Sequence, residues 1–157
     1  MIFSRKSDYG LRALIYLAER RNKAPVTLAE IAERLMIPKA FLSKILQQLA
    51  KKGVVRSLKG PSGGFALAVD PKEVTMKEIV TEIDGPLRVF ECFASESDCS
   101  LYSDCLVLDV FNKVEDEVAR VLSGYTLADF HFPPGVTDAT LAKPVAAPAG
   151  RPGPKAG

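Results

Sequence analysis

The sequence of 157 residues lacks several features that would place it in common protein classes. It has no tryptophan, one histidine and three cysteines, and it holds no run of about 18 apolar residues, the length that predicts a membrane span. Its amino terminus has no apolar stretch before a small-residue cleavage site, so we expect no signal peptide and a cytoplasmic protein. An odd number of cysteines argues against a disulfide framework and favours metal or redox chemistry. With one histidine and no catalytic triad or phosphate-loop pattern, we expect no enzyme.

Acidic residues are missing from a long stretch of the chain. Residues 1–69 carry 13 Lys and Arg against 4 Asp and Glu, whereas residues 70–157 carry 8 against 15, although the net charge is only +2. From Arg34 to Val69 there are seven basic residues and no acidic one. Such a block is typical of a surface that binds a polyanion, because neutralising phosphates with Lys and Arg releases condensed counterions. Charge alone also fits a solvated basic face.

Hydrophobic periodicity predicts three helices in the first third of the chain. The first covers residues 4–21, with apolar positions at i, i+3, i+4 and i+7. The second begins at Thr27, where the spacing to Glu30 is that of a capping box, in which each side chain bonds the other's backbone N–H. The third follows Pro38, which suits a first helical turn, and ends near Gly53. Its inward positions are expected to be Leu42, Ile45, Leu46 and Leu49.

The second and third helices are joined by a short turn, and the third is polar and basic on its outer face. This arrangement predicts a helix-turn-helix, although any pair of helices in a bundle gives a similar pattern. The next segment favours the helix-turn-helix over a helical bundle, because residues 54–58 and 65–69 are predicted strands joined by a glycine-rich turn with basic flanks. Residues 1–70 are therefore predicted to be a winged helix-turn-helix DNA-binding domain. The residues expected to contact DNA are Lys39, Ala40, Phe41, Ser43, Lys44, Arg56, Lys59, Ser62, Gly63 and Gly64.

The rest of the chain is predicted to hold four parts, and the fold class is mostly α. Residues 71–91 are a connecting segment whose helix opens with a capping box at Thr75. Residues 106–131 contain a long helix whose apolar residues recur by threes and fours, which favours a dimerisation helix over packing within one chain. Residues 132–157, rich in proline, alanine and glycine, are expected to form a disordered tail. The fourth part, residues 92–105, holds all three cysteines.

The spacing of Cys92, Cys99 and Cys105 restricts the chemistry of this segment. Six and five residues separate them, so no C-x2-C pair typical of zinc exists, and His131 lies too far along the chain to be a favoured ligand. Loosely spaced thiolates suit a larger object such as an iron–sulfur cluster. A thiol redox switch, zinc and no ligand remain alternatives. A small electron carrier would also hold a cluster, but it would not need a basic wing.

Four parts of the sequence are informative together: Ser7–Arg12 with Tyr16–Ala18, Ile37–Leu42, Lys59–Phe65, and the three cysteines. Over residues 1–130 the sequence with these parts resembles the Rrf-two family of bacterial transcription regulators. This family includes iron–sulfur cluster regulators, nitric-oxide-sensing repressors and rhizobial iron regulators. The resemblance implies a homodimer that binds a palindromic operator in double-stranded DNA and a cluster held by the three cysteines. It also implies a repressor that senses iron, redox or nitric-oxide status; a cluster-free thiol regulator is the alternative.

The fourth cluster ligand is where the chain departs from some of these relatives. Cluster-biogenesis regulators place a histidine close behind the third cysteine, but this chain has Leu108 there. Asp8 matches the aspartate that nitric-oxide sensors donate across the dimer to a [4Fe-4S] cluster, so the resemblance implies Asp8 as the fourth ligand and favours [4Fe-4S] over [2Fe-2S]. An aspartate in a first helical turn also simply complements the helix dipole. Ser43 replaces a glutamate that tunes site choice in the cluster-biogenesis regulators.

Overall fold

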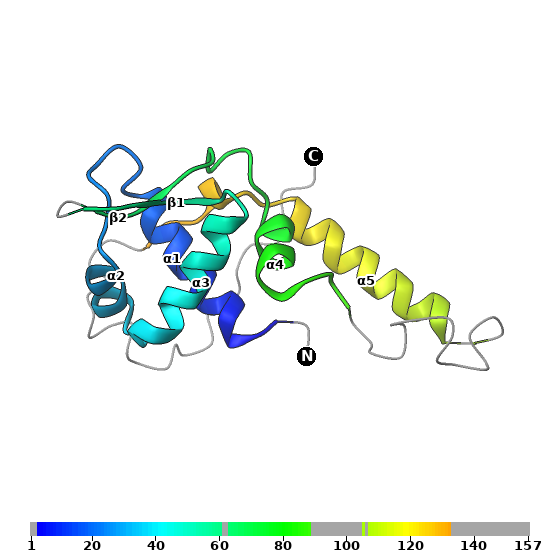
Figure 1. Ribbon diagram of the computed structural model, residues 1–157. Coiled ribbons are helices and arrows are strands. Elements are labelled where there is room, and N and C mark those ends of the chain that lie inside the picture. The colour runs from blue at the N-terminus through cyan, green and yellow to red at the C-terminus, as the bar shows by residue number, and fades with distance from the viewer. Residues whose placement is uncertain (1–2, 61–62, 89–104, 106, 133–157) are drawn as a thin grey trace.

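The computed structural model describes residues 3–60, 63–88, 105 and 107–132. This part of the chain is mostly helical, as predicted, and holds one two-stranded antiparallel sheet (Figure 1). None of its helices is long and apolar enough to cross a membrane. In chain order the elements are α1 (Arg5–Ala18), α2 (Leu28–Leu35), α3 (Lys39–Lys51), β1 (Val55–Leu58), β2 (Gly64–Leu67), α4 (Met76–Asp84), α5 (Leu108–Ser123) and the short 3-10 helix η4 (Leu127–Asp129).

Two of the α-helices, α2 and α4, start at threonine caps, and only one of the two predicted capping boxes forms. At α4 the Thr75 hydroxyl accepts from the Glu78 N–H and the Glu78 carboxylate accepts from the Thr75 N–H, so both halves are present. At α2 the Thr27 hydroxyl accepts from the Glu30 N–H, but the Glu30 carboxylate turns elsewhere. The prediction of a full box at Thr27 is therefore wrong in its second half.

The Glu30 carboxylate instead joins α2 to α1. It accepts from the Tyr16 hydroxyl at 3.0 Å and pairs with the Arg20 guanidinium at 3.0 Å. The Arg20 guanidinium also lies 4.7 Å from the centroid of the Tyr16 ring. Burial, reinforced by the bond to Glu30, raises the pKa of the Tyr16 hydroxyl. Two tertiary contacts of the Glu30 carboxylate thus replace one local cap.

The turn between α2 and α3 is tight and uses an unusual residue. Met36 ends α2 in the left-handed conformation, with φ of 53°, and its side chain is exposed. Ile37 then enters the core, and Pro38 stands at the N-cap of α3. The other end of α3 is followed by Gly53, whose φ of 78° suits glycine, as the sequence predicts.

A third extended segment completes the β-hairpin. β1 and β2 pair with Val55 opposite Leu67 and Leu58 opposite Gly64. Beside them, Val26 exchanges two backbone hydrogen bonds with Phe65, at 2.9 and 2.8 Å. A Cβ atom on Gly64 would overlap the Val26 carbonyl, so glycine is required there for the segments to approach.

The core lies between α1, α2, α3 and the hairpin, and α4 closes it. The four inward positions predicted for α3 are all at most 1% exposed. Leu14 and Leu17 from α1 and Ile31 from α2 meet them, and α4 adds Ile79 and Ile83. By contrast, α5 has no buried residue and runs away from this body beyond α4 (Figure 1).

Candidate nucleic-acid interface and cysteine segment

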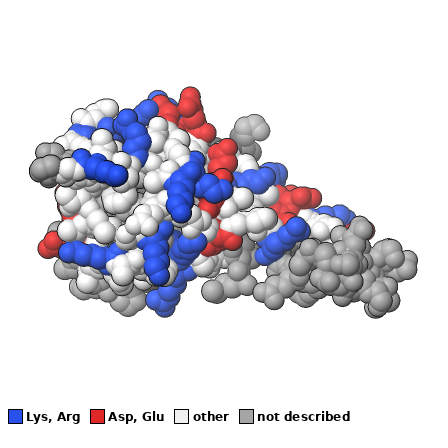
Figure 2. All heavy atoms as spheres, viewed as in Figure 1, with Lys and Arg blue, Asp and Glu red and all other residues white. Residues whose placement is uncertain are grey.

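The outer face of α3 presents the residues predicted to contact DNA. Lys39, Ala40, Phe41 and Lys44 are exposed and Ser43 is half-buried. Pro38 provides no side-chain cap, so side chains do not occupy the backbone N–H groups of the first turn of α3. Figure 2 shows Lys and Arg side chains gathered on the face that α3 and the hairpin form. A basic helix whose N-cap residue makes no side-chain hydrogen bond is suited to bind phosphates at its first turn.

Phe41 has a structural contact that its sequence position did not reveal. Its ring meets the Tyr9 ring of α1 edge to face, with centroids 5.7 Å apart and planes at 87°. Phe41 is 40% exposed, so the same side chain borders solvent and anchors the start of α3 on α1. Asp8, the predicted cluster ligand, is the residue before Tyr9.

The hairpin carries the other predicted DNA contacts. Arg56 and Lys59 are exposed. Gly63 and Gly64 are half-buried, and the Gly63 N–H donates to the Gly60 carbonyl at 2.9 Å. Ser62 lies outside the described residues. The two glycines therefore have a role within the fold, because a Cβ on Gly63 would overlap the Leu58 carbonyl just as one on Gly64 would overlap that of Val26.

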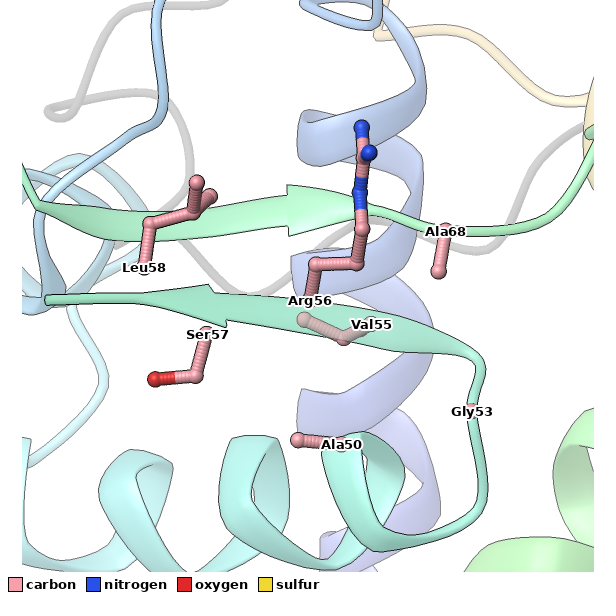
Figure 3. Close-up of a pocket in the computed structure, with 7 residues that line it drawn as sticks. All are labelled: Ala50, Gly53, Val55, Arg56, Ser57, Leu58 and Ala68. Atoms are coloured by element: carbon pink, nitrogen blue, oxygen red, sulfur yellow. The ribbon is translucent and has the colours of Figure 1, made fainter.

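A groove separates α3 from β1 on this face (Figure 3). Its volume is about 540 Å³. Along β1 the side chains alternate, so that Ser57 points toward α3 and Arg56 points the other way. Leu58 at its edge is 43% exposed. The groove is lined by Ala50, Gly53, Val55, Arg56, Ser57, Leu58 and Ala68.

The cysteine segment is described only at its end. Cys105 is a free, half-buried cysteine whose carbonyl accepts from the Leu108 N–H at 3.2 Å, at the start of α5. Cys92 and Cys99 lie outside the described residues. Within the ranges that the structure describes, no three His, Cys, Asp or Glu side chains gather as a metal site. His131 is exposed.

Asp8 lies on the exposed side of the first turn of α1. Its carboxylate pairs with the Arg12 guanidinium at 2.9 Å, one helical turn further on, and the two side chains are 48% and 38% exposed. A pair this exposed contributes little to stability, because water screens it. The carboxylate can therefore exchange Arg12 for another partner at little cost.

The apolar residues predicted to form one seam on α5 divide into two stripes. Phe111 and Val118 are half-buried, together with Leu108 and Leu122 at the same helical spacing. An adjacent stripe remains in solvent, between 41% and 58% exposed, and consists of Val107, Val110, Val114 and Val121. Exposed valines at helical spacing form an apolar surface that water disfavours.

A cluster around Asp84, missed by the sequence analysis, ties the end of α4 to the start of α1. The carboxylate accepts from the Ser4 N–H at 3.0 Å and from the Ser4 and Ser7 hydroxyls, each at 2.6 Å. Ser7 is 1% exposed. Partial burial by itself raises the pKa of the Asp84 carboxyl, but the bonds from Ser4 and Ser7 outweigh it and hold that pKa below its usual range.

Comparison with known proteins gives a family and a fold. Residues 3–131 match the family model described as "Rrf2: Iron-dependent Transcriptional regulator". The chain is 33% identical over 124 residues to the HTH-type transcriptional regulator NsrR of Bacillus subtilis, covering 78% of this chain and 85% of the relative. It is 29% identical over 129 residues to the HTH-type transcriptional regulator IscR of Serratia proteamaculans, covering 82% and 78%.

Two solved structures show the same arrangement. IscR of T. potens aligns with a TM-score of 0.64 and 32% identity, over 82% of this chain and 85% of that one. CymR of B. subtilis, the global cysteine regulator of that organism, aligns with a TM-score of 0.65 and 27% identity, over 82% of this chain and 95% of that one. The predicted winged helix-turn-helix is confirmed by this likeness.

Proposed function

Because the chain belongs to the Rrf2 family of transcriptional regulators, we propose that it is a dimeric repressor whose binding to a palindromic operator depends on an iron–sulfur cluster. The observation that supports DNA binding most directly is the outer face of α3. It carries exposed Lys39 and Lys44, and no acidic residue occurs between Arg34 and Val69. Phosphates can therefore approach this stretch of the chain without meeting a carboxylate of its own.

In this proposal α3 enters the major groove. Lys39, Ala40, Ser43 and Lys44 lie nearest the base edges and flanking phosphates. The tip of the hairpin, Ser62–Gly64, is slim enough to follow the minor groove, with Arg56 and Lys59 on the backbone.

The groove between α3 and β1 fits a sugar–phosphate strand passing between the helix and the wing. Its Ala50, Gly53 and Ala68 lining leaves room for a deoxyribose. The Ser57 hydroxyl, which points into this space, can donate to a phosphate oxygen (Figure 3).

A second copy of the chain fits the exposed valine stripe of α5. Pairing two such helices would bury Val107, Val110, Val114 and Val121, each of which is left in solvent in the single chain. Two recognition helices related by a two-fold axis read a palindrome.

The cluster would be held by Cys92, Cys99 and Cys105, with Asp8 of the second copy as the fourth ligand. Thiolates and a carboxylate are a suitable donor set, and Cys105 and Asp8 are both accessible in the described chain. When bound, the cluster supplies a group that oxidants, nitric oxide or loss of iron can alter. We favour [4Fe-4S], with [2Fe-2S] as the alternative.

A cluster-free thiol regulator is the second candidate. The likeness to CymR favours it, since that structure is described as a cysteine regulator. Here the three cysteines would change redox state themselves. Cys105 is free and half-buried, so it is available for either role.

DNA binding is tested by titrating salt against operator affinity for the wild type and for Lys44→Ala. If Lys44 contacts a phosphate, the variant binds more weakly and its slope of log affinity against log salt is flatter by about one. Lys113→Ala, an exposed lysine on α5, is the matched control and should behave as the wild type. Equal slopes and affinities for wild type and Lys44→Ala would exclude Lys44 from the interface.

The cluster is tested by anaerobic purification followed by absorbance and Mössbauer spectroscopy. Brown protein that retards a promoter fragment supports the cluster, and Cys92→Ala should remove the colour. Colourless protein whose DNA affinity changes with thiol oxidation supports the thiol regulator instead. Asp8→Ala should change the spectrum and the rate of reaction with nitric oxide; unchanged spectrum and rate would remove Asp8 from the ligand set.

A further inference from the structure

The last turn of α4 is held by side chains from outside that helix. A helix leaves its final carbonyl groups without partners, and at α4 these include the carbonyls of Glu82 and Ile83. The Gln48 side-chain amide of α3 donates to both, at 2.7 and 3.2 Å. The Lys6 ammonium of α1 donates to the Ile83 carbonyl at 2.8 Å. The end of α4 is therefore capped by the two helices beside it.

Gln48 does not act alone on this side of α3. Lys52, one turn further on, pairs with the Glu82 carboxylate at 2.9 Å. Residues four apart lie on one edge of a helix, so Lys44, Gln48 and Lys52 follow each other along α3. This edge begins at Lys44, an exposed lysine predicted to contact DNA, and ends at Lys52, which is bonded to Glu82 of α4.

The end of α4 is also fixed to α1 by further contacts. The Asp84 carboxylate holds Ser4 and Ser7, and Gly10 lets α1 approach closely, since a Cβ there would overlap the Ile83 side chain and lie 3.3 Å from the Ile45 Cγ2 atom. Because both α1 and α3 are bonded to it, the end of α4 serves as a common support.

We propose that Gln48 is a positioning residue for DNA recognition: its amide sets the pose of α3 against the end of α4, so that Lys44 and Ser43 meet the operator. This role rests on the proposed DNA binding. Gln48 is half-buried and bonds only protein carbonyls in the described contacts, so it acts through α3 and not by touching DNA. A small change in the tilt of a recognition helix displaces every contact along it.

The test compares operator affinity for the full chain with Gln48→Met, which keeps the length and loses the donor. We expect affinity to fall about tenfold, the loss that removal of one interaction of hydrogen-bond size causes. The slope of log affinity against log salt should stay close to the wild-type value, because every lysine is retained and a small tilt worsens the geometry of the contacts without removing a charge from the phosphates; Lys44→Ala should flatten it. Gln48→Lys, which can donate to the same carbonyls and suits a helix carboxyl end, should recover most of the affinity.

A control separates positioning from general stability. Thr75→Ala removes the cap at the other end of α4 and should lower Tm about as much as Gln48→Met does. At temperatures well below Tm its operator affinity should stay within about twofold of the wild type. Gln48→Met with wild-type affinity, or Thr75→Ala with the same loss of affinity, would overturn the role of Gln48. Failure of the wild type itself to bind any operator would instead refute the proposed function.

Discussion

The bond between Asp84 and Ser7 offers a quantitative test of how α4 is fixed to α1. Asp84→Ala removes the acceptor for two hydroxyls and one N–H, and it leaves the Ser7 hydroxyl, which is 1% exposed, without its carboxylate partner. Ser7→Ala removes the buried hydroxyl and leaves the carboxylate its two bonds from Ser4. The double variant removes both partners, so its cost should be less than the sum of the two single costs.

The magnitude follows from the bonds and their exposure. A hydrogen bond to a charged group contributes about 1.5–3 kcal/mol, and an unsatisfied buried hydroxyl costs about 1–3 kcal/mol. Because solvent screens the partly exposed carboxylate, we take the low end of each range. We expect Asp84→Ala to cost about 2–3 kcal/mol, Ser7→Ala about 1 kcal/mol, and the coupling between them to be about 1 kcal/mol.

The coupling between Asp84 and Ser7 should weaken as the pH falls. The Asp84 pKa is lower in the folded chain than its ordinary value, so its contribution is fully present above the unfolded pKa of about 4 and is lost as the pH falls through the folded pKa. Urea unfolding of the wild type, the two single variants and the double variant at pH 7 and at pH 3 measures both quantities. Asp116→Ala, an exposed carboxylate on α5, is the control and should change stability little. A coupling near zero at pH 7, or one that grows on acidification, would refute the reasoning.

Three further predictions concern the wing, the exposed helix and the cysteines. Gly64→Ala should destabilise the chain by about 1–3 kcal/mol and weaken DNA binding, because the new Cβ meets the Val26 carbonyl. Thermal unfolding checks this, and Gly124→Ala is the mild control, because Gly124 has a φ of −76° and a Cβ there would lie 3.4 Å from its nearest neighbour. Val110→Asp with Val114→Asp should convert a dimer to a monomer in sedimentation and weaken operator binding, whereas a dimer that persists would exclude this stripe as the interface. Cys105→Ala should abolish the difference in operator affinity between protein with intact and with oxidised cysteines or cluster, as titrations of both forms measure; an unchanged difference would exclude Cys105 from both candidate roles.

Local patterns in the sequence predicted most of the elements of the described chain. The inward positions of α3 follow from apolar spacing, and the box at Thr75 follows from a three-residue interval, because both depend on neighbours within one or two turns. The basic face also follows directly from the order of residues. These features lie on the outer and inner sides of single helices, where periodicity is sufficient.

Competition between local and distant partners could not be predicted in the same way. Glu30 has the spacing of a cap, yet Tyr16 and Arg20 take its carboxylate, because folding brings α1 against α2. The apolar seam of α5 divided for a similar reason, since part of it lies toward the rest of the chain and part remains in solvent. Spacing of the cysteines left several ligands open, because the number of intervening residues does not determine how thiolates meet in space.

The sequence by itself determined the helices, the hairpin and the concentration of positive charge that marks the DNA-binding half. Only the tertiary structure decided that Gly64 is needed for Val26, that Asp84 holds Ser4 and Ser7, and that Gln48 caps α4. Each of these pairs joins segments more than 30 residues apart. No local pattern specifies such a pair, because its members become neighbours only when the core has packed.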